Sequence, residues 1–147
     1  MRNATAEKAL AAGIRDGVSW GPFLVVNGKS SYVSGNGGWG LAARTAIGQR
    51  KDGTVLLLVV DSNSTRTRGA GMRELAEIMV GYGAVNAANL DGGTSSVMVM
   101  PSAEALKVNK DAKTDGYSTE YRFINDPVDS ALRHKTRPIA DAFVVDR

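Results

Sequence analysis

The residues best suited to chemistry in this chain are the eight from Asn89 to Ser96, which read Asn-Leu-Asp-Gly-Gly-Thr-Ser-Ser. They end the mostly apolar run 84–90 and bring one carboxylate, two glycines and three hydroxyls to one point. The carboxylate of Asp91 can move protons, and glycine backbone N–H groups can approach an anion closely. This combination favours chemistry on a phosphorylated or polyhydroxylated substrate. The alternative is a β-hairpin turn, because Asp-Gly between apolar runs is a strong turn signal.

A second carboxylate follows another apolar run. Residues 55–60 are apolar at every position, as expected of a central strand buried on both faces, and Asp61 comes next. Strand 55–60, an amphipathic helix at 72–82 and strand 85–90 fit a β-α-β unit with parallel strands. Neighbouring strands lie about 4.8 Å apart, so Asp61 and Asp91 would meet beyond the carboxyl ends of the strands and serve as acid and base. Either Asp could instead cap a turn or a helix.

Arg44 is the candidate for contact with an anion. It opens a strand at 44–49 in which the following residues are mostly small, so it is either a surface side chain or an anion clamp. The only histidine, His134, lies in a charged segment, which argues against a Ser-His-Asp triad. Ser95 and Ser96 are therefore interpreted as hydrogen-bond donors rather than as nucleophiles.

Composition excludes several classes of function. The 147 residues fit a single domain, and 43% hydrophobic with 22% charged residues is typical of a globular protein. The absence of cysteine excludes disulfides, thiolate catalysis and Cys-bound metals, and no zinc or calcium spacing is present, so no metal or cofactor is expected. A net charge of +3 without a basic block argues against nucleic acid as a partner. No run approaches the ~20 apolar residues of a membrane span, and the N-terminus lacks an apolar signal region.

The pattern predicts an α/β or α+β fold, in which a mixed sheet holds the central β-α-β unit and is flanked by helices. Asn27-Gly28 predicts a type I′ hairpin turn, and residues 102–138 are mostly polar and read as irregular. The elements expected are helices at 5–12 and 72–82 and strands at 23–26, 29–33, 44–49, 54–60, 85–90, 96–100 and 139–145.

Taken together, these segments resemble the phosphodiester glycosidase family over roughly residues 21–145. The matching pieces are Gly21-Pro22-Phe23-Leu24, Asn27-Gly28-Lys29, 44–48, 56–61, 74–76, 83–87, 89–96 and the closing Arg137-Pro138-Ile139-Ala140. The chain departs from the family pattern at Thr94, where a third glycine is usual, and at Ser62-Asn63, where Gly-Arg is usual. The resemblance is interpreted as lacking the family's N-terminal half. The single domain 1–147 is thus expected to be the C-terminal part of such a domain, to associate with itself or with a separate N-terminal piece, and to have low or no turnover on its own.

The resemblance implies hydrolysis of a sugar–phosphate diester or of a related glycosidic bond in a surface glycan such as an exopolysaccharide. It implies a secreted or cell-surface protein, acid/base roles for Asp91 and Asp61, and phosphate contacts from Arg44 and the Gly92-Gly93 backbone. A function of a different class remains open, namely a non-catalytic carbohydrate-binding or scaffold module that keeps the motif as a turn. The substrate-binding residues implied are Arg44, Thr45, Asn89, Gly92, Gly93, Ser95 and Ser96.

Overall fold

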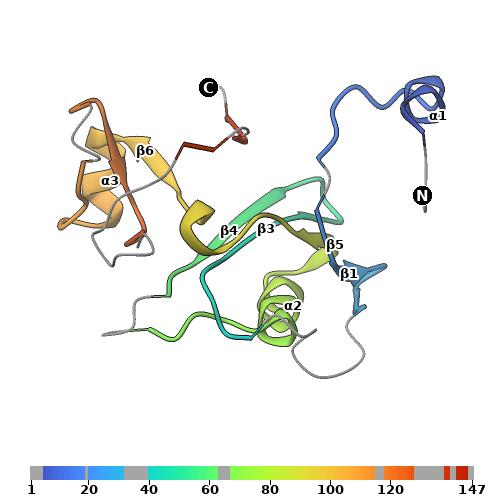
Figure 1. The fold of residues 1–147 in the computed structure, drawn as a ribbon, viewed down its shortest axis with the longest axis horizontal. Helices are drawn as coiled ribbons and strands as arrows, with labels where there is room; N and C mark the ends of the chain where they lie inside the picture. Colours follow the sequence, from blue (N-terminus) through green and yellow to red (C-terminus); the bar gives the residue numbers. More distant parts are fainter. Residues whose placement is uncertain are drawn as a thin grey trace.

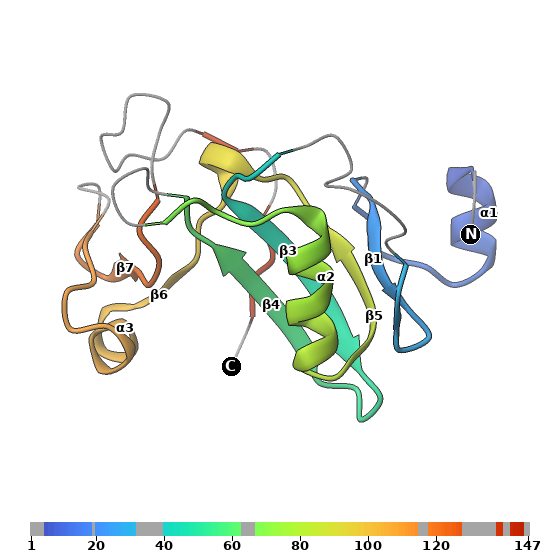
Figure 2. The same ribbon diagram turned by 90° about the horizontal axis from the view of Figure 1, so that it is seen from below.

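The computed structural model describes residues 5–18, 20–31, 40–62, 67–114, 118–127, 138–139 and 142–145. A five-stranded sheet carries one helix on its face, and a smaller two-stranded sheet with a helix lies at one end (Figures 1 and 2). The predicted α+β class is confirmed. The elements are α1 (Ala6–Ala11), β1 (Phe23–Val26), β2 (Lys29–Ser30), β3 (Arg44–Arg50), β4 (Val55–Val60), α2 (Met72–Gly81), β5 (Ala84–Asn89), the 3-10 helix η1 (Gly93–Ser95), β6 (Val99–Pro101), α3 (Ser102–Val108) and β7 (Tyr121–Phe123).

Two hairpins build most of the five-stranded sheet, whose order is β2-β1-β5-β3-β4 and whose pairings are all antiparallel. β1 and β2 are joined at Asn27-Gly28, where φ values of 53° and 75° fit the predicted type I′ turn. β3 and β4 are joined by the short turn 51–54. β5 then pairs with β1 on one side and with β3 on the other.

Helix α2 covers one face of the sheet and forms the core with it (Figure 2). The carboxylate of Glu74 accepts a hydrogen bond at 2.8 Å from the N–H of Gly71, which satisfies a donor at the start of the helix. Gly48 makes room for the helix, because a Cβ at this position would lie 2.5 Å from Cε of Met79. The buried residues of α2 are Met72, Leu75, Ala76 and Met79, which are the apolar positions predicted from the sequence.

The interpretation of 55–60 as a central strand buried on both faces is wrong. β4 lies at the edge of the sheet, and the side chains of Val55 and Leu57 are exposed. The short turn at 51–54 pairs β3 with β4 at a small entropic cost of loop closure. β5 pairs with the other side of β3, so β3 lies between β4 and β5. β4 and β5 still run in the same direction, since β3 is antiparallel to both, and α2 connects them. The β-α-β unit is therefore present without neighbouring strands, and the sheet is antiparallel rather than mixed.

Apolar side chains remain exposed on the five-stranded sheet away from α2. Val55 and Leu57 alternate along β4 with residues that pack against the core, so they point to the opposite face. Phe23 and Val26 on β1 are also exposed. Association with a second copy or with a separate N-terminal piece would bury such a surface. That association stays a prediction.

The C-terminal part of the chain differs from its predicted irregular structure. β6 covers Val99–Pro101 rather than 96–100, and it pairs with β7 across α3. These elements are short, and α3 buries only Ala105, so their apolar periodicity is too brief to read from the sequence. The expected strand at 139–145 is absent from the described residues 139 and 142–145, while His134 and Arg137 lie outside the described residues. In the part of the chain that the structure describes, no helix has the length and apolar character needed to cross a membrane.

Candidate active site

The predicted site residues meet at the end of the five-stranded sheet where β3 begins and β4 and β5 finish, which is called the site edge below. Because β3 is antiparallel to β4 and β5, its first residues lie beside the last residues of both. Arg44 pairs with Val60, and the N–H of Leu90 donates to the C=O of Thr45 at 2.9 Å. Asp61 directly follows β4, and Asp91 follows β5 after one residue, Leu90. The residues brought to this edge are Arg44, Thr45, Asp61, Asn89, Asp91, Gly92, Gly93, Ser95 and Ser96.

The prediction that Asp61 and Asp91 follow neighbouring strands is wrong. β3 lies between β4 and β5, so the backbones that carry Asp61 and Asp91 are two strand spacings apart, about 9.6 Å. The two carboxylates are held by different partners, one set in the loop after β5 and the other in the segment after β7. A shared site at this edge must therefore span the start of β3.

Asp91 lies in the loop 90–95, which is called the Asp91 loop below, and its carboxylate closes this loop. The N–H of Gly92 donates to its Oδ1 at 2.9 Å, and the hydroxyl of Ser95 donates to its Oδ2 at 2.7 Å. The N–H of Gly93 donates to the C=O of Ala43 at 2.8 Å. Residue 92 must be small, because a Cβ there would lie 2.8 Å from the oxygen of Ala43. The loop is thus packed against the residue before β3, and the carboxylate has a defined orientation.

The expected phosphate contact by Gly92 and Gly93 conflicts with the bonds that these N–H groups already make. Both groups donate within the protein, one to Asp91 and the other to Ala43. A phosphate that accepted from them would have to replace these bonds. The contact therefore stays a prediction, and it requires the loop to rearrange.

Buried polar side chains support the loop from the sheet. Ser96 is 2% exposed, and its Oγ accepts a hydrogen bond from the hydroxyl of Thr45 at 3.1 Å. Asn89 is 1% exposed; its Nδ2 donates to the C=O of Gly21 at 2.8 Å, and its N–H donates to the C=O of Pro22 at 3.0 Å. Within the described residues, Oδ1 of Asn89 is buried without a hydrogen-bond partner. Direct contact of these side chains with sugar hydroxyls stays a prediction.

Replacement of Asn89 should test its role as an anchor for the segment that enters β1. Asn89→Ala leaves the C=O of Gly21 without its buried donor, so we expect the free energy of unfolding to fall by about 1–3 kcal/mol in denaturant titrations. Asn86→Ala on the same strand is the control, because Asn86 is exposed and accepts only a longer, 3.3 Å bond from the N–H of Asn27. Equal losses for the two variants would contradict the anchoring role.

Arg44 is buried rather than a surface side chain. It is 4% exposed, with Nε donating to the C=O of Ala70 at 3.0 Å and Nη2 donating to the C=O of Gly40 at 2.7 Å. Burial lowers the pKa of Arg44, yet a guanidinium keeps its charge at neutral pH. Its Cδ lies 3.8 Å from the position that a Cβ on Gly92 would occupy. The aliphatic part of the side chain therefore lies next to the Asp91 loop, while the guanidinium is held by residues 40 and 70, and its use as an anion clamp stays a prediction.

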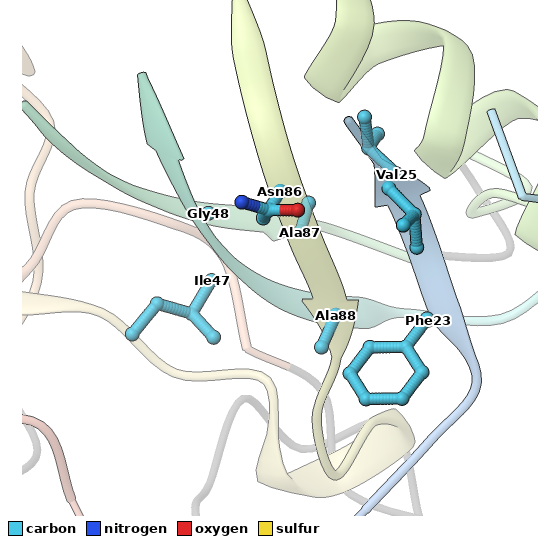
Figure 3. Close-up of a pocket in the computed structure, with 8 residues that line it drawn as sticks. Phe23, Val25, Ile47, Gly48, Asn86, Ala87 and Ala88 are labelled. Atoms are coloured by element: carbon cyan, nitrogen blue, oxygen red, sulfur yellow. The ribbon is translucent and has the colours of Figure 1, made fainter. Parts of the chain in front are cut away.

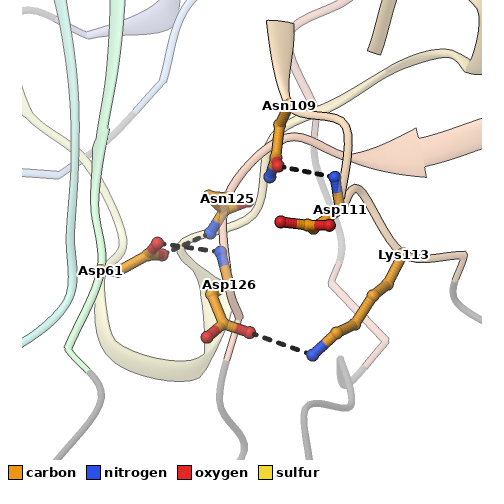
Figure 4. A network of polar contacts seen from close by, with 6 residues as sticks. All are labelled: Asp61, Asn109, Asp111, Lys113, Asn125 and Asp126. Carbon is orange, nitrogen blue, oxygen red and sulfur yellow. Dashed lines mark hydrogen bonds and ion pairs between the residues drawn. The ribbon is translucent and has the colours of Figure 1, made fainter. Parts of the chain in front are cut away.

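Asp61 is held by two residues that the sequence did not single out, Asn125 and Asp126. Nδ2 of Asn125 donates to Oδ1 of Asp61 at 2.8 Å, and the N–H of Asp126 donates to Oδ2 at 2.8 Å (Figure 4). The hydroxyl of Thr67 donates to the C=O of Asp61 at 3.0 Å. Both new residues lie more than 60 positions from Asp61 along the chain. The element next to them in the sequence is the three-residue strand β7, which is too short to give a clear pattern. That signal was too weak to predict the contact.

A hollow of about 450 Å³ lies on the sheet between β1, β5 and β3 (Figure 3). Asn86 is the single polar side chain in its lining, and the lining contains no carboxylate, so this hollow lacks groups for acid/base chemistry. The polar edge described above is therefore the better candidate. Among the described residues, no three side chains of His, Asp or Glu lie together so that they could hold a metal ion. The lining consists of Phe23, Val25, Val26, Ile47, Gly48, Asn86, Ala87 and Ala88.

Comparison with known proteins identifies relatives of this chain. It is 33% identical over 98 residues to the SPbeta prophage-derived uncharacterized protein YomE of Bacillus subtilis, covering 65% of this chain and 15% of that protein. It is 43% identical over 60 residues to the N-acetylglucosamine-1-phosphodiester alpha-N-acetylglucosaminidase of Bos taurus, covering 41% of this chain and 11% of the bovine protein. A hypothetical protein from Synechocystis aligns with a TM-score of 0.49 and 31% identity, covering 63% of this chain and 18% of that chain.

The sequence model of one family, described as phosphodiester glycosidase, matches residues 2–146. The chain belongs to the phosphodiester glycosidase family, and the predicted resemblance is confirmed. The chain spans 15% or less of the length of the curated relatives that it matches.

Proposed function

We propose that this chain hydrolyses the glycosidic bond of a sugar 1-phosphodiester, the type of bond named for its bovine relative. The observation that carries the proposal is the edge of the sheet where Asp61 and Asp91 flank the start of β3, at which the buried Arg44 side chain passes beside the Asp91 loop. Two oriented carboxylates and one fixed cation suit a reaction in which water loses a proton and a phosphate group departs.

The reaction assigns a task to each group. Water adds to the anomeric carbon, the bond from this carbon to the phosphate oxygen breaks, and its electron pair leaves with the phosphate. Asp61 or Asp91 takes the proton of the water. Arg44 supplies positive potential toward the departing phosphate, and the N–H groups of Gly92 and Gly93 would join it after the loop rearranges. The side chains proposed to position the sugar or the phosphate oxygens are Thr45, Asn89, Ser95 and Ser96.

The family membership also supports a broader biological proposal. We propose that the natural substrate is a surface glycan that contains such a diester, that the protein acts outside the cell or at its surface, and that residues 1–147 are the C-terminal part of a phosphodiester glycosidase domain. These proposals are inferred from membership of the family. The identity of the sugar can be tested most directly.

The test is turnover of the methyl phosphodiester of α-N-acetylglucosamine 1-phosphate. We expect release of N-acetylglucosamine and methyl phosphate in proportion to time and to protein concentration. Asp91→Asn protein prepared in the same way should release far less. Release that is identical in wild-type and Asp91→Asn samples would remove Asp91 from the proposed reaction. Release that is also identical in the Asp61→Asn/Asp91→Asn double variant would show that the activity comes from a contaminant, and the proposed function would be lost.

A non-catalytic carbohydrate-binding or scaffold module is the second candidate. It is favoured by the hydrogen bonds of the loop, because both oxygens of Asp91 and the N–H groups of Gly92 and Gly93 already have partners within the protein. Calorimetry with N-acetylglucosamine 1-phosphate separates the two functions when it is run beside the turnover assay. Binding without any release of methyl phosphate from the diester would select the second candidate.

A further inference from the structure

Asn125 connects the two halves of the candidate site through one side chain. Its Nδ2 donates to Oδ1 of Asp61 at 2.8 Å and to the C=O of Ser96 at 2.9 Å, and its Oδ1 accepts from the N–H of Met98 at 2.9 Å. Asp61 follows β4, whereas Ser96 and Met98 follow the Asp91 loop. Asn125 itself lies in the segment after β7, so three separate parts of the chain meet at its amide.

These partners fix the orientation of the Asn125 amide. A flipped amide would place its NH₂ group against the N–H of Met98 and its oxygen against the two acceptor oxygens of Asp61 and Ser96. The carboxylate of Asp61 is fixed in turn, because its other oxygen accepts from the N–H of the next residue, Asp126, at 2.8 Å (Figure 4). Rotation of the Asp61 carboxylate would break both bonds.

We infer that Asn125 is a positioning residue that sets the carboxylate of Asp61 against the loop carrying Asp91. Ser96 directly follows that loop, and its hydroxyl is bonded to Thr45 at the start of β3, so the contact with Asn125 ties Asp61 to the rest of the edge. The inference rests on the proposed function for its effect on turnover, but not for the contact itself. A purely structural role, in which Asn125 attaches the β7 segment to the sheet, makes different predictions.

A double-mutant cycle on turnover separates the two roles. Using the methyl phosphodiester of α-N-acetylglucosamine 1-phosphate, we expect Asn125→Ala to lower kcat about 10-fold or more with KM changed less than about 2-fold, because a small misplacement of a catalytic group is costly. In the Asp61→Asn background the same change should lower kcat less than about 2-fold. An equal loss in both backgrounds, or an effect on KM alone, would overturn the positioning role.

Asn109→Ala is the matched control for this cycle. Asn109 belongs to the same polar region, but its side chain accepts only from the N–H of Asp111, at 3.0 Å, and is not bonded to Asp61 (Figure 4). We expect kcat within about 2-fold of wild type for this variant. A loss as large as that of Asn125→Ala would show that general disturbance of the region lowers turnover, which would also overturn the inference.

A second readout decides the contact even if the wild-type protein does not hydrolyse the probe, in which case the proposed function fails separately. Denaturant unfolding of wild type, Asn125→Ala, Asp61→Asn and the double variant should be non-additive by about 5-fold or more in the unfolding equilibrium constant. Amide hydrogen exchange at Met98 should become about 10-fold faster or more in Asn125→Ala, because the acceptor of its N–H is lost. Additive stabilities with unchanged exchange would overturn the inference.

Discussion

Asp91→Asn is expected to lower kcat/KM for the sugar phosphodiester by about 100-fold or more while the protein keeps its fold. The substitution removes the charge and keeps the shape. Its remaining oxygen can accept from the N–H of Gly92, and its NH₂ group can donate to the hydroxyl of Ser95, which can rotate to accept. The loop should therefore keep its hydrogen bonds, and the free energy of unfolding should change by less than about 1 kcal/mol.

Asp52→Asn is a matched control for this experiment. Asp52 also lies in an Asp-Gly turn and accepts from the backbone, at 3.0 Å from the N–H of Thr54, but this turn lies at the opposite end of β3 from Arg44. Turnover of Asp52→Asn should stay within about 2-fold of wild type. Full activity of a well-folded Asp91→Asn protein, measured by kcat/KM beside circular dichroism, would remove Asp91 from the acid/base pair.

Arg44→Lys is expected to weaken binding of N-acetylglucosamine 1-phosphate about 10-fold or more, measured by calorimetry, while binding of N-acetylglucosamine changes less than about 2-fold. Lysine keeps the charge but loses the planar fork, and Nε of Arg44 already bonds Ala70 while Nη2 bonds Gly40. Loss of one such charged hydrogen bond should also lower the free energy of unfolding by about 1.5–3 kcal/mol.

The two ligands distinguish an electrostatic role from a structural one. An equal loss for the phosphate and for the neutral sugar would mean that Arg44 only holds the loops at residues 40 and 70. An unchanged affinity for both would place Arg44 outside the site. Arg73→Lys serves as the control, because Arg73 is exposed on α2 and, within the described part of the chain, forms an ion pair only with Glu77, at 3.0 Å.

Local features of the fold were predictable because nearby residues determine them. The turn at Asn27-Gly28 needs two positive φ values, which this pair adopts readily, and the structure has them. The buried face of α2 follows from apolar residues at helical spacing, and all four of its predicted positions are buried. The concentration of acid, glycine and hydroxyl groups at 89–96 likewise predicts one half of the candidate site, and that assignment stays a prediction.

Strand order was not predictable from the same pattern. The run Val55–Val60 is apolar at every position, which is typical of a central strand, yet it forms an edge strand with exposed Val55 and Leu57. The placement of β3 between β4 and β5 depends on the hairpin at 51–54 and on which strand then pairs with β3, and neither is written in the periodicity of β4 or β5. The sequence pattern therefore predicts a shorter distance between Asp61 and Asp91 than the strand order allows.

The remaining half of the site depends on contacts between distant residues. Asn125 lies just after β7, which pairs with β6, and no local motif marks its contact with Asp61. The sequence indicated a cation at Arg44, but the burial of this side chain and its bonds to residues 40 and 70 arise from loops that the strand pattern does not describe. Composition and spacing thus predict candidate chemical groups, and the tertiary structure shows how these groups are arranged.

The most direct test of the proposed glycosidase activity is the position of bond cleavage. The methyl phosphodiester of α-N-acetylglucosamine 1-phosphate is hydrolysed in water enriched in ¹⁸O, and the mass of the methyl phosphate product is measured by mass spectrometry. The phosphate product is the one to read, because the free sugar exchanges its anomeric oxygen with water. Attack at the anomeric carbon predicts methyl phosphate without ¹⁸O. Methyl phosphate that carries one ¹⁸O atom would show attack at phosphorus and would contradict a glycosidase.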